Sequence, residues 1–207
     1  MPLIHMLGAG EFDLGRFLTW IVALALAITI HEFGHAYRAE KAGDPTPRAH
    51  GRVSLYPWDH YDPLGTTLIL LFGLGWAKPV PTNPMNFRHP RRDEIMVSLW
   101  GPLSNIILAV LLAIPVRFAL VPVEYAVPLV DIMYLNLLLA VFNLIPVWPL
   151  DGSHILSAIL PVETARKLDQ AYRQFGPMLL LVVFMIAGRL VWPVVDGLMY
   201  LLVGLNL

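Results

Sequence analysis

The sequence contains no cysteine and few charged residues. None of the 207 residues is cysteine, and 14% are Asp, Glu, Lys or Arg, whereas about a quarter of a soluble domain is charged. The lack of cysteine excludes disulfides and thiolate metal ligands, so a metal site must use histidine and carboxylates. The net charge of -1 and the grouping of basic residues in loops give no indication of nucleic-acid binding.

Apolar residues dominate instead. They make up 57% of the chain, with a mean hydropathy of +0.65, which is typical of an integral membrane protein. The N-terminus lacks the basic region of a cleavable signal peptide, so we expect the first apolar run to be a retained span. We predict one polytopic helical domain over residues 1–207, with spans at about 16–38, 94–118, 126–148 and 176–206, the last kinked or split.

Basic residues set the predicted orientation. Eleven of the 14 Lys and Arg residues lie in three loops, at 38–52, 78–92 and 166–173, and the positive-inside rule places all three in the cytoplasm. The apolar segment 64–77 lies between two of these loops and is about 21 Å long as a helix, too short to cross. We therefore predict that it is re-entrant, with a short interfacial helix as the alternative, in a multi-pass protein of the plasma membrane.

Two segments near this re-entrant element suggest extended structure. Arg52–Tyr56 alternates in polarity, as a strand does, and the Pro-rich run that begins at Lys78–Thr82 is typical of extended chain. The predicted fold class is thus an all-α membrane bundle with a re-entrant segment and short membrane-associated β-strands. Their edges could pair with an extended peptide.

The motif His31-Glu32-Phe33-Gly34-His35 lies inside the first span. On a helix His31 and His35 share one face a turn apart and can reach one tetrahedral cation, while Glu32 beside them can handle the protons of a water molecule. A histidine pair in simple helix packing is the alternative. Buried ionisable groups cost about 2.5 to 3.5 kcal/mol each in lipid, which favours a functional site.

A catalytic zinc needs a third protein ligand and an open position for water. The continuation that gives soluble zincins a third histidine is missing, because Arg38 and Lys41 occupy its glycine and histidine positions. Asp151 is the best candidate, since Pro146 and Pro149 break the preceding helix and free the chain to turn the acid inward.

Topology also favours Asp151. If 64–77 doubles back, the first and third spans run in the same direction, and Asp151 lies at the cytoplasmic end that is near His31. The competing acid, Asp131, sits near the outer end of the third span. Water would reach this site from the cytoplasm.

Three other polar residues need an interpretation. The amide of Asn143 precedes Asp151 by just over two turns and could hold a substrate strand or an oxyanion, although an interhelical hydrogen bond is the alternative. Asn105 is predicted to be structural, with Gly101 allowing close approach of helices. His154 receives no role.

These motifs together resemble the site-2 protease family of intramembrane metalloproteases, in its compact form without a PDZ domain. The resemblance covers about residues 28–155. It rests on the HExxH motif, on Asn143-Leu-Ile-Pro-Val-Trp-Pro-Leu-Asp151-Gly152 and on shorter matches at 43–46, 51–52, 62–65, 75–81 and 101–105. His154 departs from it, because Arg or Gly is more usual after the Asp-Gly pair.

The resemblance implies one zinc per chain, bound by His31, His35 and Asp151, with Glu32 as general base. It also implies that a transmembrane protein substrate is cleaved within the lipid bilayer. The alternative from another class is a non-catalytic membrane protein that binds or transports metal, against which the intact Glu32 weighs. A prenyl-protein endopeptidase would require a downstream glutamate as third ligand. The sequence names neither the substrate nor the oligomeric state.

Overall fold

The computed structural model of the chain describes residues 13–72 and 75–204. Within them, regular structure consists of α-helices and two short 3-10 helices. In chain order they are α2 (Leu14–Ala42), α3 (Thr46–Ala49), η1 (Pro57–Asp59), α4 (Pro63–Phe72), η2 (Pro84–Asn86), α5 (Pro90–Arg117), α6 (Val123–Asn143), α7 (Asp151–Ile159) and α8 (Val162–Val203).

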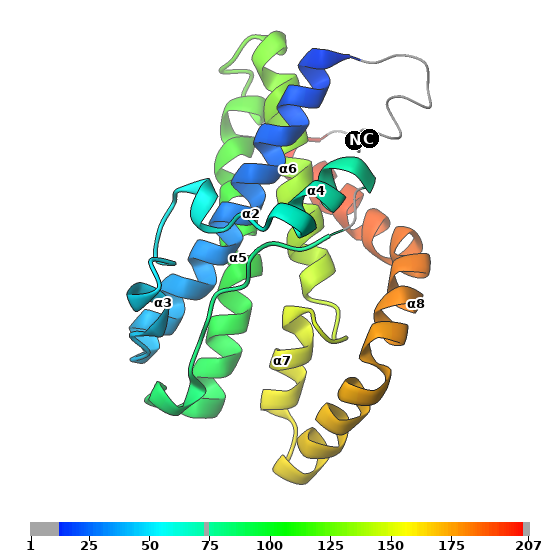
Figure 1. Cartoon of the computed structure of the whole chain (residues 1–207). Helices are drawn as coiled ribbons and strands as arrows, with labels where there is room; N and C mark the ends of the chain where they lie inside the picture. Colours follow the sequence, from blue (N-terminus) through cyan, green and yellow to red (C-terminus); the bar gives the residue numbers. More distant parts are fainter. Residues whose placement is uncertain (1–12, 73–74, 205–207) are drawn as a thin grey trace.

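Four of these helices are long and apolar enough to cross a membrane: α2, α5, α6 and α8. Four such helices are typical of a multi-pass membrane protein. The 42-residue α8 begins well before the predicted last span and includes that span as far as Val203, and it contains Pro177 and Pro193. Figure 1 shows that α8 is strongly curved, as expected where proline removes backbone hydrogen bonds from a helix.

The predicted β-strands are wrong, because the described residues contain no strand. The Arg52–Tyr56 segment has no partner strand, and its polar groups are used differently. The Arg52 guanidinium donates to the backbone carbonyls of Lys78 and Pro79. Those carbonyls are acceptors that a strand ladder would need, so a side-chain clamp replaces the sheet between the two segments.

Helices α2, α5 and α6 form the centre of the molecule (Figure 1). Gly34 of α2 lies against the Trp100 backbone and Ser104 of α5, where a Cβ would clash. The Ser104 hydroxyl donates to the Ile30 carbonyl at 2.9 Å. Small residues at such crossings bring helix backbones close together, and here they bring the HExxH turn directly against α5.

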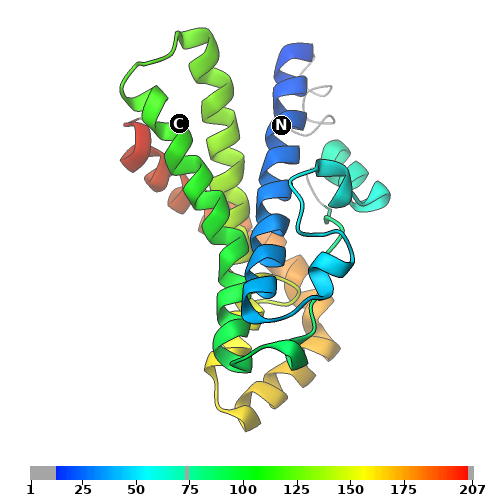
Figure 2. The ribbon, with the colours of Figure 1, turned by 90° about the vertical axis from the view of Figure 1, so that its left-hand side faces the viewer.

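The segment from α3 to α4 lies on the side of α2 that faces away from α5 and α6 (Figure 2). Its ends meet, since Lys78 N donates to His60 O at 3.0 Å. Between them the chain rises to α4 and, from residue 75 onward, descends toward the end of the molecule at which α5 begins (Figure 1). A re-entrant element needs this hairpin shape, and its depth in the bilayer stays a prediction.

Asp44 joins the two loops at that end of the molecule. Fully buried, it accepts hydrogen bonds from Thr46 N and Oγ1, from Asn83 N and from Asn86 Nδ2, at 2.6 to 3.1 Å. Burial opposes ionisation, but these donors outweigh it and hold the pKa of Asp44 below its ordinary value. The carboxylate thus fastens the chain after α2 to the chain before α5.

We expect Asp44→Ala to lower the free energy of unfolding by about 2 to 3 kcal/mol, because it leaves partly buried donors without an acceptor. Thermal unfolding in detergent measures the loss. Since the pKa is lower in the folded state, the contribution of Asp44 is present at neutral pH and disappears as the pH falls through that value. Removing the exposed carboxylate of Glu163 in Glu163→Gln should change stability by less than about 1 kcal/mol.

Candidate metal centre

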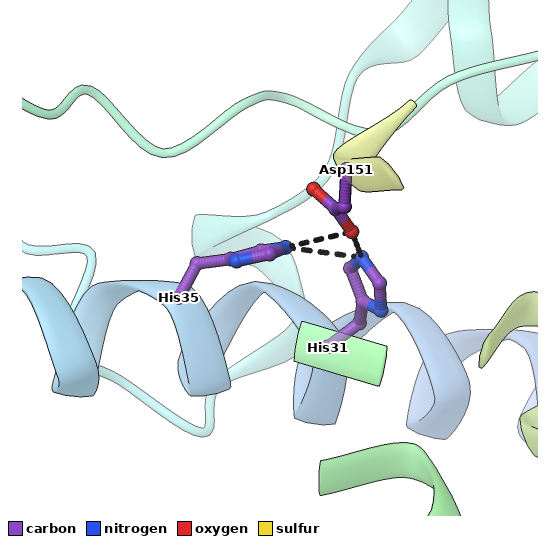
Figure 3. Close-up of side chains that lie close together, drawn as sticks. All are labelled: His31, His35 and Asp151. Atoms are coloured by element: carbon purple, nitrogen blue, oxygen red, sulfur yellow. Dashed lines mark hydrogen bonds and ion pairs between the residues drawn. The ribbon is translucent and has the colours of Figure 1, made fainter. Parts of the chain in front are cut away.

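Three side chains converge at one point between α2 and α7. His31 Nε2 and His35 Nε2 are 3.1 Å apart, and Asp151 Oδ2 lies 3.1 Å from the first and 3.3 Å from the second. Figure 3 shows the two rings and the carboxylate pointing toward one another. The three are the group of described His and acidic residues that could hold a metal ion.

The local sequence explains how each group arrives there. His31 and His35 are one turn apart on α2, so their rings emerge from the same face, with planes 83° apart. Helix α6 ends at Asn143, and the Pro-rich stretch after it contains no helix before Asp151 begins α7. Gly152 packs against the carbonyls of residues 144 and 145, where a Cβ would clash. This close turn brings Asp151 back toward α2.

Hydrogen bonds on the far side of each ring define which nitrogen is free. His35 Nδ1 lies 2.8 Å from Val97 O, and because a carbonyl only accepts, this nitrogen must carry the proton. His31 Nδ1 lies 2.7 Å from Asn105 Oδ1. With Nδ1 protonated in both rings, two Nε2 lone pairs face the Asp151 carboxylate.

This donor set fits a zinc ion. Three lone-pair atoms at 3.1 to 3.3 Å repel one another unless a proton or a metal cation lies between them. Tetrahedral zinc with bonds of about 2.0 to 2.1 Å separates its ligand atoms by about 3.3 to 3.4 Å. In addition, the buried Asp151 Oδ2 has no hydrogen-bond partner among the described residues, which is typical of an atom with another ligand.

Glu32 lies beside this cluster without a partner of its own. It is half-buried and makes no hydrogen bond or ion pair with another described residue. Burial lowers the pKa of Arg52, and the charge of Glu32 opposes that shift, so the two side chains share one electrostatic environment. A carboxylate that is not engaged in structure is available for proton transfer.

The other predicted residues lie outside the cluster. Asn143 is half-buried and donates to Leu139 O in its own helix at 3.0 Å, without a hydrogen bond to the three converging groups. Asp131 is not in the metal-binding group. His154 lies 3.5 Å from Glu94, whose hydrogen bond raises the pKa of this histidine.

Sequence reasoning missed the surroundings of the histidines. Asn105 was predicted to be structural, yet it contacts His31, and Asn136 behind it was not singled out. The signal that could have identified both residues is the presence of an asparagine inside each of two apolar helices. The Val97 carbonyl could not have been found, since any backbone position offers the same group.

Gly101 gives a test of the geometry. A Cβ at this position would overlap the His35 ring, so Gly101→Ala should displace the imidazole and weaken zinc binding by on the order of tenfold. Competition with a fluorescent chelator measures the affinity. Gly197→Ala is the matched control, because its Cβ would meet no atom within 4 Å, and it should leave zinc affinity unchanged. Equal affinities in the two variants would contradict the geometry.

Comparison with known proteins gives consistent matches. The model of peptidase family M50 matches residues 122–187. "Putative zinc metalloprotease YwhC" of Bacillus subtilis is 37% identical over 193 residues, covering 86% of this chain and 85% of the relative. "Putative zinc metalloprotease Rip2" of Mycolicibacterium smegmatis is 34% identical over 184 residues, covering 85% and 70%.

A more distant relative is archaeal. "Zinc metalloprotease MJ0392" of Methanocaldococcus jannaschii is 30% identical over 139 residues, covering 67% of this chain and 33% of the relative. No solved structure matches the chain significantly. The extent of the similarity to YwhC shows that the chain belongs to peptidase family M50, the site-2 protease family, and is a membrane metalloprotease.

Proposed function

We propose that this protein is an intramembrane zinc protease that hydrolyses a peptide bond in or near the transmembrane helix of a membrane-protein substrate. The observation that carries the proposal is the convergence of His31 Nε2, His35 Nε2 and Asp151 Oδ2, with the unpaired Glu32 beside them, in a bundle of membrane-crossing helices. Pure metal binding requires the three ligands but gives no reason for an unpaired carboxylate next to the first histidine.

His31, His35 and Asp151 would hold one zinc ion per chain. Bound zinc supplies Lewis-acid chemistry, lowering the pKa of a water molecule and polarising a carbonyl. Asn105 Oδ1 and Val97 O accept hydrogen bonds from His31 and His35, so that each ring carries its proton at Nδ1. As a result the two rings need no rearrangement to present Nε2.

Glu32 would act as the general base. It takes a proton from the attacking water and returns that proton to the leaving nitrogen as the peptide bond breaks. Its position on α2, one residue after His31, keeps it next to the ligands. Its lack of a structural partner leaves the carboxylate oxygens free to accept a hydrogen bond.

Asn143 would hold the substrate backbone. It is the last residue of α6 and immediately precedes the non-helical stretch that leads to Asp151. One amide hydrogen is used within the helix, which leaves the second hydrogen and the oxygen for a peptide group. Donation to the substrate carbonyl would stabilise negative charge as it develops.

An apolar groove next to the centre suits a substrate helix. A cavity of about 440 Å³ lies between one face of α2 and the η1–α4 segment, lined by Ile21, Leu24, Ala25 and Ile28 on the α2 side. Ile28 is one turn before Glu32 and on the same face. The basic loops support an orientation in which this end of the bundle would face the cytoplasm. The role that we propose is regulated cleavage of membrane-anchored proteins.

Glu32→Gln tests the reaction. The amide cannot accept a proton, so we expect cleavage of a transmembrane substrate to fall by about 10²- to 10⁴-fold while zinc content stays at one per chain. Cleavage is followed on gels with purified protein in lipid vesicles, and zinc by metal analysis. Asp151→Ala should instead lose the zinc.

Two results would contradict this mechanism. Undiminished cleavage by Glu32→Gln would exclude Glu32 as the base. A wild-type protein that binds zinc stoichiometrically and cleaves no substrate would favour the metal-binding or transport alternative.

Asn143→Ala should lower kcat/KM by on the order of 10²-fold, if the side chain stabilises the oxyanion, with zinc affinity unchanged. Asn143→Asp, which keeps the size of the side chain and removes the donors, should be equally impaired. Normal kinetics in both variants would restrict Asn143 to its hydrogen bond within α6.

A further inference from the structure

Asn105 occupies a fully buried position where α2, α5 and α6 meet. Its side chain faces His31 and Ala27 of α2 and Asn136 of α6, and both asparagines have no exposed surface. Such a group is costly to bury in an apolar bundle unless every hydrogen bond is made. The direction of each bond can therefore be worked out from the acceptors around it.

A backbone carbonyl of α6 fixes the orientation of the Asn136 amide. Ile132 O lies 2.8 Å from the Asn136 side-chain amide, and since a carbonyl only accepts, this contact must be made by Nδ2. The Asn136 Oδ1 atom then faces Asn105 at 2.7 Å. An oxygen in that position must receive a hydrogen bond, so the Asn105 group opposite it is also Nδ2.

A second carbonyl gives the same orientation of Asn105. Its Nδ2 also donates to Ala27 O at 2.9 Å, so both amide hydrogens are used. Turning both amides over would place one oxygen against Ala27 O and the other against Ile132 O. Two buried oxygen–oxygen contacts would result, and this arrangement is excluded on energetic grounds.

The orientation of Asn105 determines which nitrogen of His31 carries the proton. With Nδ2 committed, Asn105 presents only Oδ1 to His31 Nδ1, 2.7 Å away, and His31 must carry its proton there. We propose that Asn105 is a positioning residue, oriented by Asn136, that holds His31 in the tautomer with a free Nε2. This inference rests on the proposed zinc site and adds to it the residues that prepare one ligand.

The two histidines are thus prepared in different ways. His35 is held by one carbonyl of α5, whereas the tautomer of His31 depends on contacts from α2, α5 and α6 together. A competent His31 therefore requires that all three helices be assembled. Residues behind a metal-bound histidine commonly alter metal affinity by 10- to 100-fold.

The test compares zinc affinities of full-length variants in detergent by chelator competition. Asn105→Leu should bind zinc 10- to 100-fold more weakly, because it removes the acceptor at His31 Nδ1. Ser104→Ala is the matched control, because it removes a hydrogen bond between the same two helices without touching either histidine. Its affinity should equal that of the wild type.

A spectroscopic measurement on the wild type covers the case in which Asn105→Leu fails to fold. In zinc-free protein at alkaline pH, the ¹⁵N spectrum of the histidine side chains should show His31 protonated at Nδ1, assigned by the signal that is lost in His31→Gln. A His31 protonated at Nε2, wild-type affinity in Asn105→Leu, or an equal loss in Ser104→Ala would overturn the proposal. None of these readouts uses cleavage, so an inactive protein would contradict the proposed function alone.

Discussion

The structure depends on one electrostatic constraint: lone pairs that converge in an apolar interior need a cation between them. Two imidazole nitrogens and a carboxylate oxygen approach to 3.1–3.3 Å in the middle of a helical bundle. The three side chains are largely buried, with 7%, 12% and 17% of their surfaces exposed, so their mutual repulsion is only weakly screened. The same closeness would favour the binding of a small divalent ion, because folding has already brought the three groups together.

The rest of the bundle serves to hold these groups in place. Gly34 and Gly101 let α5 come so close to α2 that the Val97 carbonyl and the Asn105 amide reach the far sides of the two rings. The end of α6 and the compact turn at Gly152 deliver Asp151 from the opposite side. Outside the bundle, Asp44 and the Arg52 guanidinium fasten the loops around α4, so that this segment begins and ends at one place beside the site.

Much of the site could be predicted because its signals are local. HExxH spacing gives two histidines on one helical face whatever the fold, and an acid after two prolines is conspicuous in an apolar chain. The strand prediction failed for a physical reason, since alternation over five residues shows only that a segment could be extended. A strand also needs a partner strand. Here the Arg52 side chain donates to the carbonyls of Lys78 and Pro79, which a partner strand would otherwise offer. Asn136 was missed because its function depends on Asn105, which lies on another helix.

By itself the sequence determined that this is a membrane protein and that an HExxH pair of histidines shares one helical face, because these properties follow from composition and from spacing along one helix. Only the tertiary structure decided that Asp151 meets the histidines, which nitrogen of each ring is free, and that side-chain clamps replace strands in the loops. Those features depend on groups that are far apart in the chain, and their distances are set by how closely the helices pack rather than by any local pattern.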